Sequence, residues 1–226
     1  MQPITHTGAR AWCFQEKLLA RHCLVFRYDE MVWECRTGCK CECGGEQEHL
    51  SDGNTSVIFS DAMKRYRQML LSLAEHDPFQ PDGTLKYFAD AEAAYSFWET
   101  TVNKYSVGAM TFRTDRLPAI LAVASIVAEA TEGCYLAGLW EDNLLAGLGW
   151  ITLWSPHPRH ARPHQQEYIA PTWSWASQSY EVFYRPYRTR PSRDADLDAS
   201  VDCAWAVLEG QNPYGPVSDG AIVLSG

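Results

Sequence analysis

The period of the hydrophobic pattern changes twice along this chain of 226 residues, and the change limits the possible fold more than any single motif. Helical spacing dominates residues 57–154, whereas short runs typical of strands lie near the N-terminus and in residues 168–226. Helices grouped between strands indicate an α+β protein, because a doubly wound sheet requires strands and helices to alternate. We therefore predict one α+β domain over residues 1–226, with antiparallel strands in its last third.

Three segments of the middle region have helical patterns, namely residues 60–75, 90–104 and 115–130. The last of them, LPAILAVASIVAEA, is apolar nearly all round, which predicts a helix in the middle of the core. Thr114 and Asp115 stand directly before it, where a side-chain oxygen can cap the first backbone N–H groups.

Strand patterns flank these helices on both sides. Residues 1–45 contain a short predicted helix at 9–20, then the runs HCLVFR and EMVWECR, which form a hairpin around Tyr28 and Asp29. The C-terminal third contains TWSWASQSYEVFYRPY, CAWAVLEG and GAIVLSG, and we predict a strand in each. In the first of these, Trp173 and Trp175 should share one face of the strand.

The net charge of −9 and the pI near 5.2 argue against general binding to nucleic acid or anionic membrane, since both would repel the protein at long range. No run of about 18 apolar residues predicts a membrane span, and the N-terminus has no secretory h-region. We predict a cytoplasmic protein, in which stable disulfides are rare.

Four of the eight cysteines lie within the stretch WECRTGCKCECGG. Their spacing is C-x3-C-x-C-x-C, and residues two apart in an extended chain project to the same face. Four thiolates, or three with His22 or His49, satisfy a structural zinc ion. Reduced, packed thiols and a disulfide or redox switch are the alternatives. The candidate ligands are Cys35, Cys39, Cys41 and Cys43.

The segment ARAWCFQEKLLARHCLVF resembles the last signature block of the fungal heterokaryon incompatibility (HET) domain, through Arg10, Ala11, Trp12, Gln15 and Glu16. WEC with its Cys-x-Cys, YSVGAMTFRTDRLPAI, GCYLAGLWEDNLLAGLGW and APTWSWAS are similar to segments that follow this block in HET proteins. The two earlier blocks, with a Ser-Tyr-x-Trp-Gly core and a Trp-Ile-Asp then Asn-Gln core, do not occur here. The resemblance implies that this chain is the C-terminal part of such a protein, a split-gene product or a shortened relative.

The same resemblance implies a link to non-self recognition and programmed cell death in filamentous fungi. We therefore expect an interaction or regulatory module with a protein partner. The alternative is a small standalone enzyme of fungal specialised metabolism, acting on a small molecule in a Trp/Tyr-lined pocket.

For that enzyme, the polar groups near the aromatic residues are the catalytic candidates, with Glu16 as acid or base and Arg10 holding an anion. Polar contacts that fix the helix are the alternative role of both residues. The candidate catalytic residues are Arg10, Glu16, Tyr105 and Asp115. The candidate ligand-binding residues are Trp12, Gln15, Trp173 and Trp175, for which core packing is the alternative.

Overall fold

The computed structural model describes residues 10–20, 22–26, 30–35, 38–43, 88, 90–153, 168–184 and 199–226. The chain divides into two compact units, Met1–Tyr87 and Phe88–Gly226, where the sequence analysis predicted one domain. Helices occur together with antiparallel strands, which confirms the α+β class. The helix predicted at 60–75 lies outside the described residues.

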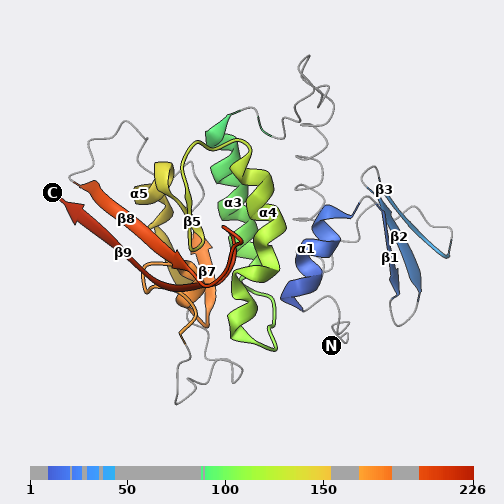
Figure 1. Ribbon diagram of the computed structural model, residues 1–226. Coiled ribbons are helices and arrows are strands. Elements are labelled where there is room, and N and C mark those ends of the chain that lie inside the picture. Colours follow the sequence, from blue (N-terminus) through green and yellow to red (C-terminus); the bar gives the residue numbers. More distant parts are fainter. Residues whose placement is uncertain are drawn as a thin grey trace. The chain divides into compact units, whose positions relative to one another are not determined.

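The described part of the first unit contains one helix followed by a three-stranded antiparallel sheet (Figure 1). The predicted hairpin is confirmed, and its register pairs Leu24 with Trp33 and Val25 with Val32. A third strand, which the sequence analysis missed, begins inside the cysteine cluster and pairs with the second. The elements are α1 (Ala11–Leu19), β1 (His22–Phe26), β2 (Met31–Cys35) and β3 (Gly38–Cys41).

Helix α1 buries Ala11, Phe14 and Leu18, a stripe with the i, i+3, i+7 spacing of one helix face. Trp12 and Glu16 therefore lie on the other side of the helix and are exposed. Arg10 occupies the N-cap position without capping the helix through its side chain. The residues that carry the HET resemblance thus belong mainly to the less buried face of α1.

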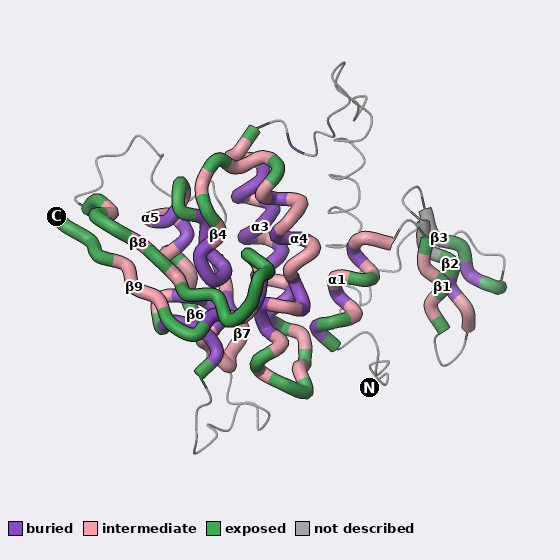
Figure 2. The backbone as a smooth tube through the Cα atoms, viewed as in Figure 1, coloured by how far each residue is buried: buried purple, intermediate pink, exposed green. Residues whose placement is uncertain are grey.

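The described part of the second unit packs three α-helices with three two-stranded antiparallel sheets, β4-β5, β6-β7 and β8-β9. Helices α3 and α4 lie side by side (Figure 1), and the buried segments concentrate along them and around β4 (Figure 2). Its elements are α3 (Ala91–Tyr105), η1 (Arg113–Arg116), η2 (Pro118–Ile120), α4 (Leu121–Ala128), β4 (Tyr135–Leu136), β5 (Leu139–Trp140), η3 (Glu141–Asn143), α5 (Leu144–Gly147), β6 (Trp150–Leu153), η5 (Trp175–Ser177), β7 (Glu181–Tyr184), β8 (Ser200–Leu208) and β9 (Val217–Ser225).

Helix α3 confirms the predicted helix at 90–104. The carboxylate of Asp90 accepts a hydrogen bond of 2.7 Å from the backbone N–H of Ala93, which satisfies one of the free donors at the helix start. Val102 is fully buried, and Phe97 and Trp98 are nearly so. The helix is held by its apolar face and by a true side-chain cap.

The helix predicted at 115–130 is shorter than expected. Two 3₁₀ turns, η1 and η2, precede α4, and α4 has no side-chain cap, so the predicted cap by Thr114 and Asp115 is wrong. Pro118 explains the difference, because it has no N–H to donate and cannot continue an α-helical hydrogen-bond pattern through this segment. The burial of Val123, Ala124 and Val127 confirms that α4 lies in the core.

The two-residue turn between β4 and β5 is strongly constrained. Ala137 has φ of 45° and Gly138 has φ of 101°. Positive φ at both central residues is typical of a type I′ hairpin turn, and for a residue such as alanine it costs about 1 kcal/mol. A Cβ atom at Gly138 would lie 2.5 Å from Nε1 of Trp175, so the close approach of the indole requires glycine.

Strand β7 lies along α3. Side chains at the end of α3 form hydrogen bonds with the backbone N–H and C=O groups of the strand. Asn103 donates to the carbonyl of Tyr184 at 3.1 Å and accepts from the N–H of the same residue at 2.6 Å. Ser106 likewise donates to Val182 O at 3.0 Å and accepts from Val182 N at 2.9 Å. The polar residues of α3 thereby cover an edge that would otherwise leave strand groups unpaired.

Candidate functional site

A cluster of five aromatic side chains fills the interior of the second unit. Trp98 is at its centre, with its ring centroid 5.8 Å from those of Tyr135 and Trp140 and 6.3 Å from that of Trp175. The rings meet edge to face, the arrangement that aromatic quadrupoles favour. The members of this aromatic cluster are Trp98, Tyr105, Tyr135, Trp140 and Trp175.

The polar edges of three cluster members bind backbone carbonyls. The indole N–H groups of Trp98 and Trp175 donate to the same acceptor, Gly138 O, at 2.9 and 2.8 Å. The hydroxyl of Tyr105 donates to Arg116 O at 2.7 Å. These groups hold the fold together, so packing is the role that the structure supports for Trp175 and Tyr105.

Two other polar atoms of the cluster are buried without a hydrogen-bond partner in the described part of the chain. They are the hydroxyl of Tyr135 and Nε1 of Trp140. Burial raises the pKa of Tyr135 far above its ordinary value, and nearby Tyr105 raises it further. Burial also raises the pKa of Tyr105, against the opposing influence of Arg116, so both phenols stay protonated at neutral pH.

The four predicted catalytic residues divide between the two units. Arg10 and Glu16 belong to the first unit, where both are exposed. Tyr105 and Asp115 belong to the second, in which the carboxylate of Asp115 contributes to the raised pKa of the buried Tyr105. The structure brings the latter two near each other, and the convergence of all four stays a prediction.

The predicted ligand-binding residues divide in the same way. Trp12 and Gln15 lie on α1, with Trp12 39% exposed. Trp173 and Trp175 do not share a strand face, because Trp173 lies in a turn and Trp175 begins the 3₁₀ helix η5. The strand predicted for TWSWASQSYEVFYRPY is therefore wrong in its first half, and β7 confirms it only at 181–184.

Ser174 explains why the alternating pattern WSWA is not a strand. Its hydroxyl accepts from the N–H of Ala176 at 3.0 Å, which caps η5, and donates to Ala137 O at 2.5 Å. The second contact joins residues 37 positions apart. The sequence did not predict that Ser174 and Trp98 bind the turn at Ala137 and Gly138. The small residues Ala137 and Gly138 between two leucines were the available signal for that turn.

Two cysteines of the predicted metal cluster form a disulfide in this structure, Cys41–Cys43. The chain turns after β3, which brings their Cα atoms to 5.3 Å, within the range that a disulfide spans. Of the three alternatives that the spacing left open, this pair agrees with the disulfide and not with reduced thiols or four thiolate ligands. The side chains of Cys35 and Cys39 lie outside the described residues.

Glu30 adds a carboxylate to this disulfide. One ligand atom from each of Glu30, Cys41 and Cys43 lies within 4.8 Å of the others. This spacing suits a metal ion, but the two sulfurs are joined in a disulfide in this structure. It is partly accessible, since Cys41 is buried whereas Cys43 is exposed. This group contains two of the four predicted ligands and a carboxylate that the sequence analysis did not include, and the four-cysteine zinc site stays a prediction.

No family model matches the chain, and neither a curated protein nor a solved structure shows significant similarity to it. Among the described helices, none combines the length and the apolar character needed to cross a bilayer.

The two buried tyrosines allow a matched test of the aromatic cluster. Tyr105→Phe removes the donor to Arg116 O and should lower the free energy of unfolding by about 1–2 kcal/mol. Tyr135→Phe removes a buried hydroxyl that has no partner among the described residues and should leave stability unchanged or raise it by up to about 1 kcal/mol. Urea unfolding measures both, and equal destabilisation by the two variants would contradict the assignment.

Proposed function

We propose that this chain is a non-catalytic protein-interaction module of the HET type, linked to non-self recognition and programmed cell death. The ordered motifs of the sequence support the family, and an exposed aromatic face on the three-stranded sheet carries the interaction. The polar groups of Tyr105 and Trp175 bind backbone carbonyls, which removes the main support for an enzyme with a Trp/Tyr-lined pocket.

One face of the sheet of the first unit carries large apolar side chains that are exposed. Leu24, Phe26 and Trp33 are 47%, 66% and 45% exposed. Residues two apart on a strand share a face, and the register places Leu24 directly opposite Trp33, so these three side chains form one surface. We call it the aromatic sheet face. Its opposite side includes the buried Val32.

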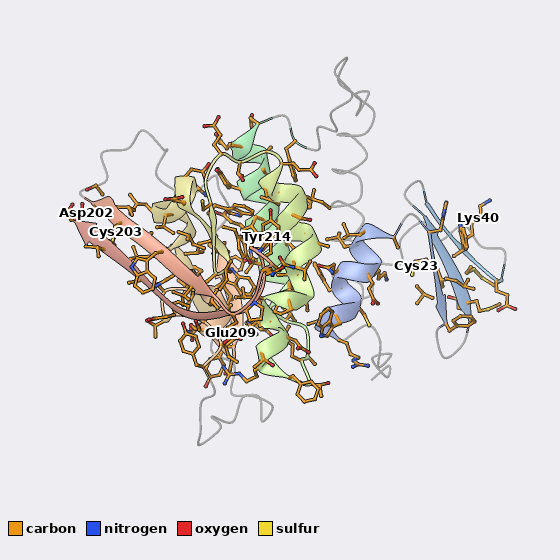
Figure 3. All side chains as sticks on the ribbon, viewed as in Figure 1. Cys23, Lys40, Asp202, Cys203, Glu209 and Tyr214 are labelled. Atoms are coloured by element: carbon orange, nitrogen blue, oxygen red, sulfur yellow. A yellow bond between two sulfur atoms is a disulfide. The ribbon has the colours of Figure 1, made fainter. Side chains whose placement is uncertain are left out.

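An exposed cluster of large apolar side chains is typical of a surface that binds another protein, because aromatic anchors contribute much of the energy at such interfaces. His22 stacks on Trp33 with ring centroids 5.4 Å apart, and the register pairs Trp33 with Lys40. Lys40 projects from β3 (Figure 3) and adds a positive charge beside the apolar centre.

The positive charge of Lys40 beside the aromatic sheet face favours a partner that offers apolar side chains flanked by a carboxylate. A second copy is disfavoured, since two chains of net charge −9 repel each other at long range. We propose that the partner is the effector region that carries the two earlier HET blocks, within one longer protein or on a separate one.

The test supplies a polypeptide with the two earlier HET blocks in trans and measures its affinity for this chain by calorimetry. Phe26→Ser and Trp33→Ala should each weaken binding by about tenfold or more, because each removes an aromatic anchor. Val207→Ser alters a similarly exposed side chain, 46% accessible, in the second unit and should leave the affinity unchanged.

Co-expression in a filamentous fungus supplies the second readout. The wild-type pair should reduce growth, and the two aromatic-face variants should restore it. Absence of binding by the wild-type chain, together with normal growth, contradicts the proposal, as does equal binding by all the variants.

We further propose that zinc binds the Glu30, Cys41 and Cys43 group once its disulfide is reduced. A dithiol reductant gives two thiols and is itself oxidised to a disulfide; zinc then displaces the two thiol protons. Glu30 supplies an oxygen ligand, and tetrahedral coordination needs one ligand more, for which Cys35 and Cys39 remain the sequence-based candidates. Bound zinc would then fix the end of β3 to the start of β2.

Zinc affinity, measured by competition with a chromophoric chelator, tests this site. Reduced protein should bind one equivalent, and oxidised protein should bind much less, since disulfide sulfurs are not thiolates. Cys43→Ser should weaken binding by at least about tenfold, whereas Cys203→Ser, which alters an exposed free cysteine, should not. Equal affinity of the two redox forms would exclude the site.

A further inference from the structure

The short helix η1 places two arginines on one side of the chain. Arg113 and Arg116 are its first and last residues, and side chains three apart in a 3₁₀ helix are nearly eclipsed. Both guanidinium groups reach the same distant segment, since Arg113 donates to Ser177 O and Arg116 to Tyr180 O. Each of these hydrogen bonds is 3.4 Å long, which is weak for an N–H donor.

Each arginine also has a buried donor without an acceptor in the described part of the chain. These donors are Nη1 of Arg113 and Nε of Arg116. Arg116 is only 7% exposed, and its other neighbour is the ring of Trp175, whose centroid lies 5.6 Å from the guanidinium carbon. A buried charge is costly unless an opposite charge or a full set of hydrogen bonds compensates it. The local surroundings of Arg116 supply only part of that compensation.

The pKa of Arg116 agrees with its burial and with the nearby charge of Arg113. Burial lowers the pKa of Arg116 to about 10, and neighbouring Arg113 lowers it further, while Tyr105 opposes the shift. The two positive charges therefore act on each other in a partly desolvated place. A group with negative charge between them would relieve both the repulsion and the missing hydrogen bonds.

We propose that Arg113 and Arg116 bind the oxyanion of a small molecule, a phosphate or a carboxylate, through Nη1 of the first and Nε of the second. Guanidinium donors suit such oxygens because their N–H groups point in fixed directions within one plane. The adjoining chain is accessible, with Phe112 65% exposed and Arg113 itself half-buried. The site belongs to the second unit alone and is independent of the aromatic sheet face.

Thermal unfolding of the full chain tests the site with inorganic phosphate and with acetate, each exchanged against chloride at constant ionic strength. An oxyanion that binds the folded state should raise the midpoint in a saturable way. Arg113→Gln should raise the half-saturating concentration by about tenfold or more, the effect of losing one charged hydrogen bond. Lys17→Gln removes a positive charge from the first unit and should leave the half-saturating concentration unchanged.

The arms of the experiment distinguish the sources of the oxyanion. Saturation by phosphate alone assigns a phosphate ligand, and saturation by acetate alone assigns a carboxylate. Arg113→Gln is chosen because Arg116 is buried, and a change there can unfold the protein for other reasons. The proposal fails if neither anion acts beyond chloride, or if Arg113→Gln responds like the wild type.

Discussion

The second unit depends on one backbone carbonyl, that of Gly138. It accepts hydrogen bonds from two indole groups that come from α3 and from η5, so a single acceptor joins three segments far apart in sequence. This is possible only because the turn adopts positive φ and residue 138 has no Cβ atom. Ser174 adds a third contact at the neighbouring carbonyl of Ala137. The aromatic cluster is then packed around a fixed point instead of being held by apolar contact alone.

Local patterns predicted those parts of the fold that local physics determines. The hairpin near the N-terminus, helix α3 and the last two strands follow from the hydrophobic period and the turn residues between the runs, and the structure confirms them. The segment WSWA could not be predicted, because its alternation has the period of a strand while Ser174 is held by a contact 37 residues away. Likewise, Pro118 divides a segment whose apolar character suggested one continuous helix.

In the candidate sites, too, local patterns were predictable from the sequence, whereas contacts between distant segments were not. The sequence nominated Tyr105 as a catalytic candidate and Trp175 as a ligand-binding candidate. Their rings lie 6.0 Å apart, and their polar atoms bind backbone carbonyls of the fold. The cysteine spacing indicated a local cluster, but which sulfurs pair depends on the turn after β3. The two arginines of η1 carry no sequence signal, because their hydrogen bonds reach Ser177 and Tyr180, 64 positions away along the chain.

The central claim is that one carbonyl serves two indole donors, and a double-substitution cycle tests it most directly. Replacing the indole of Trp98, of Trp175 or of both with benzothiophene keeps the ring shape and removes only the N–H group. Either single change leaves Gly138 O with one donor, whereas both together leave it unsatisfied. The double variant should lose about 1–2 kcal/mol more stability in urea unfolding than the sum of the singles. Additivity within about 0.3 kcal/mol would contradict the account.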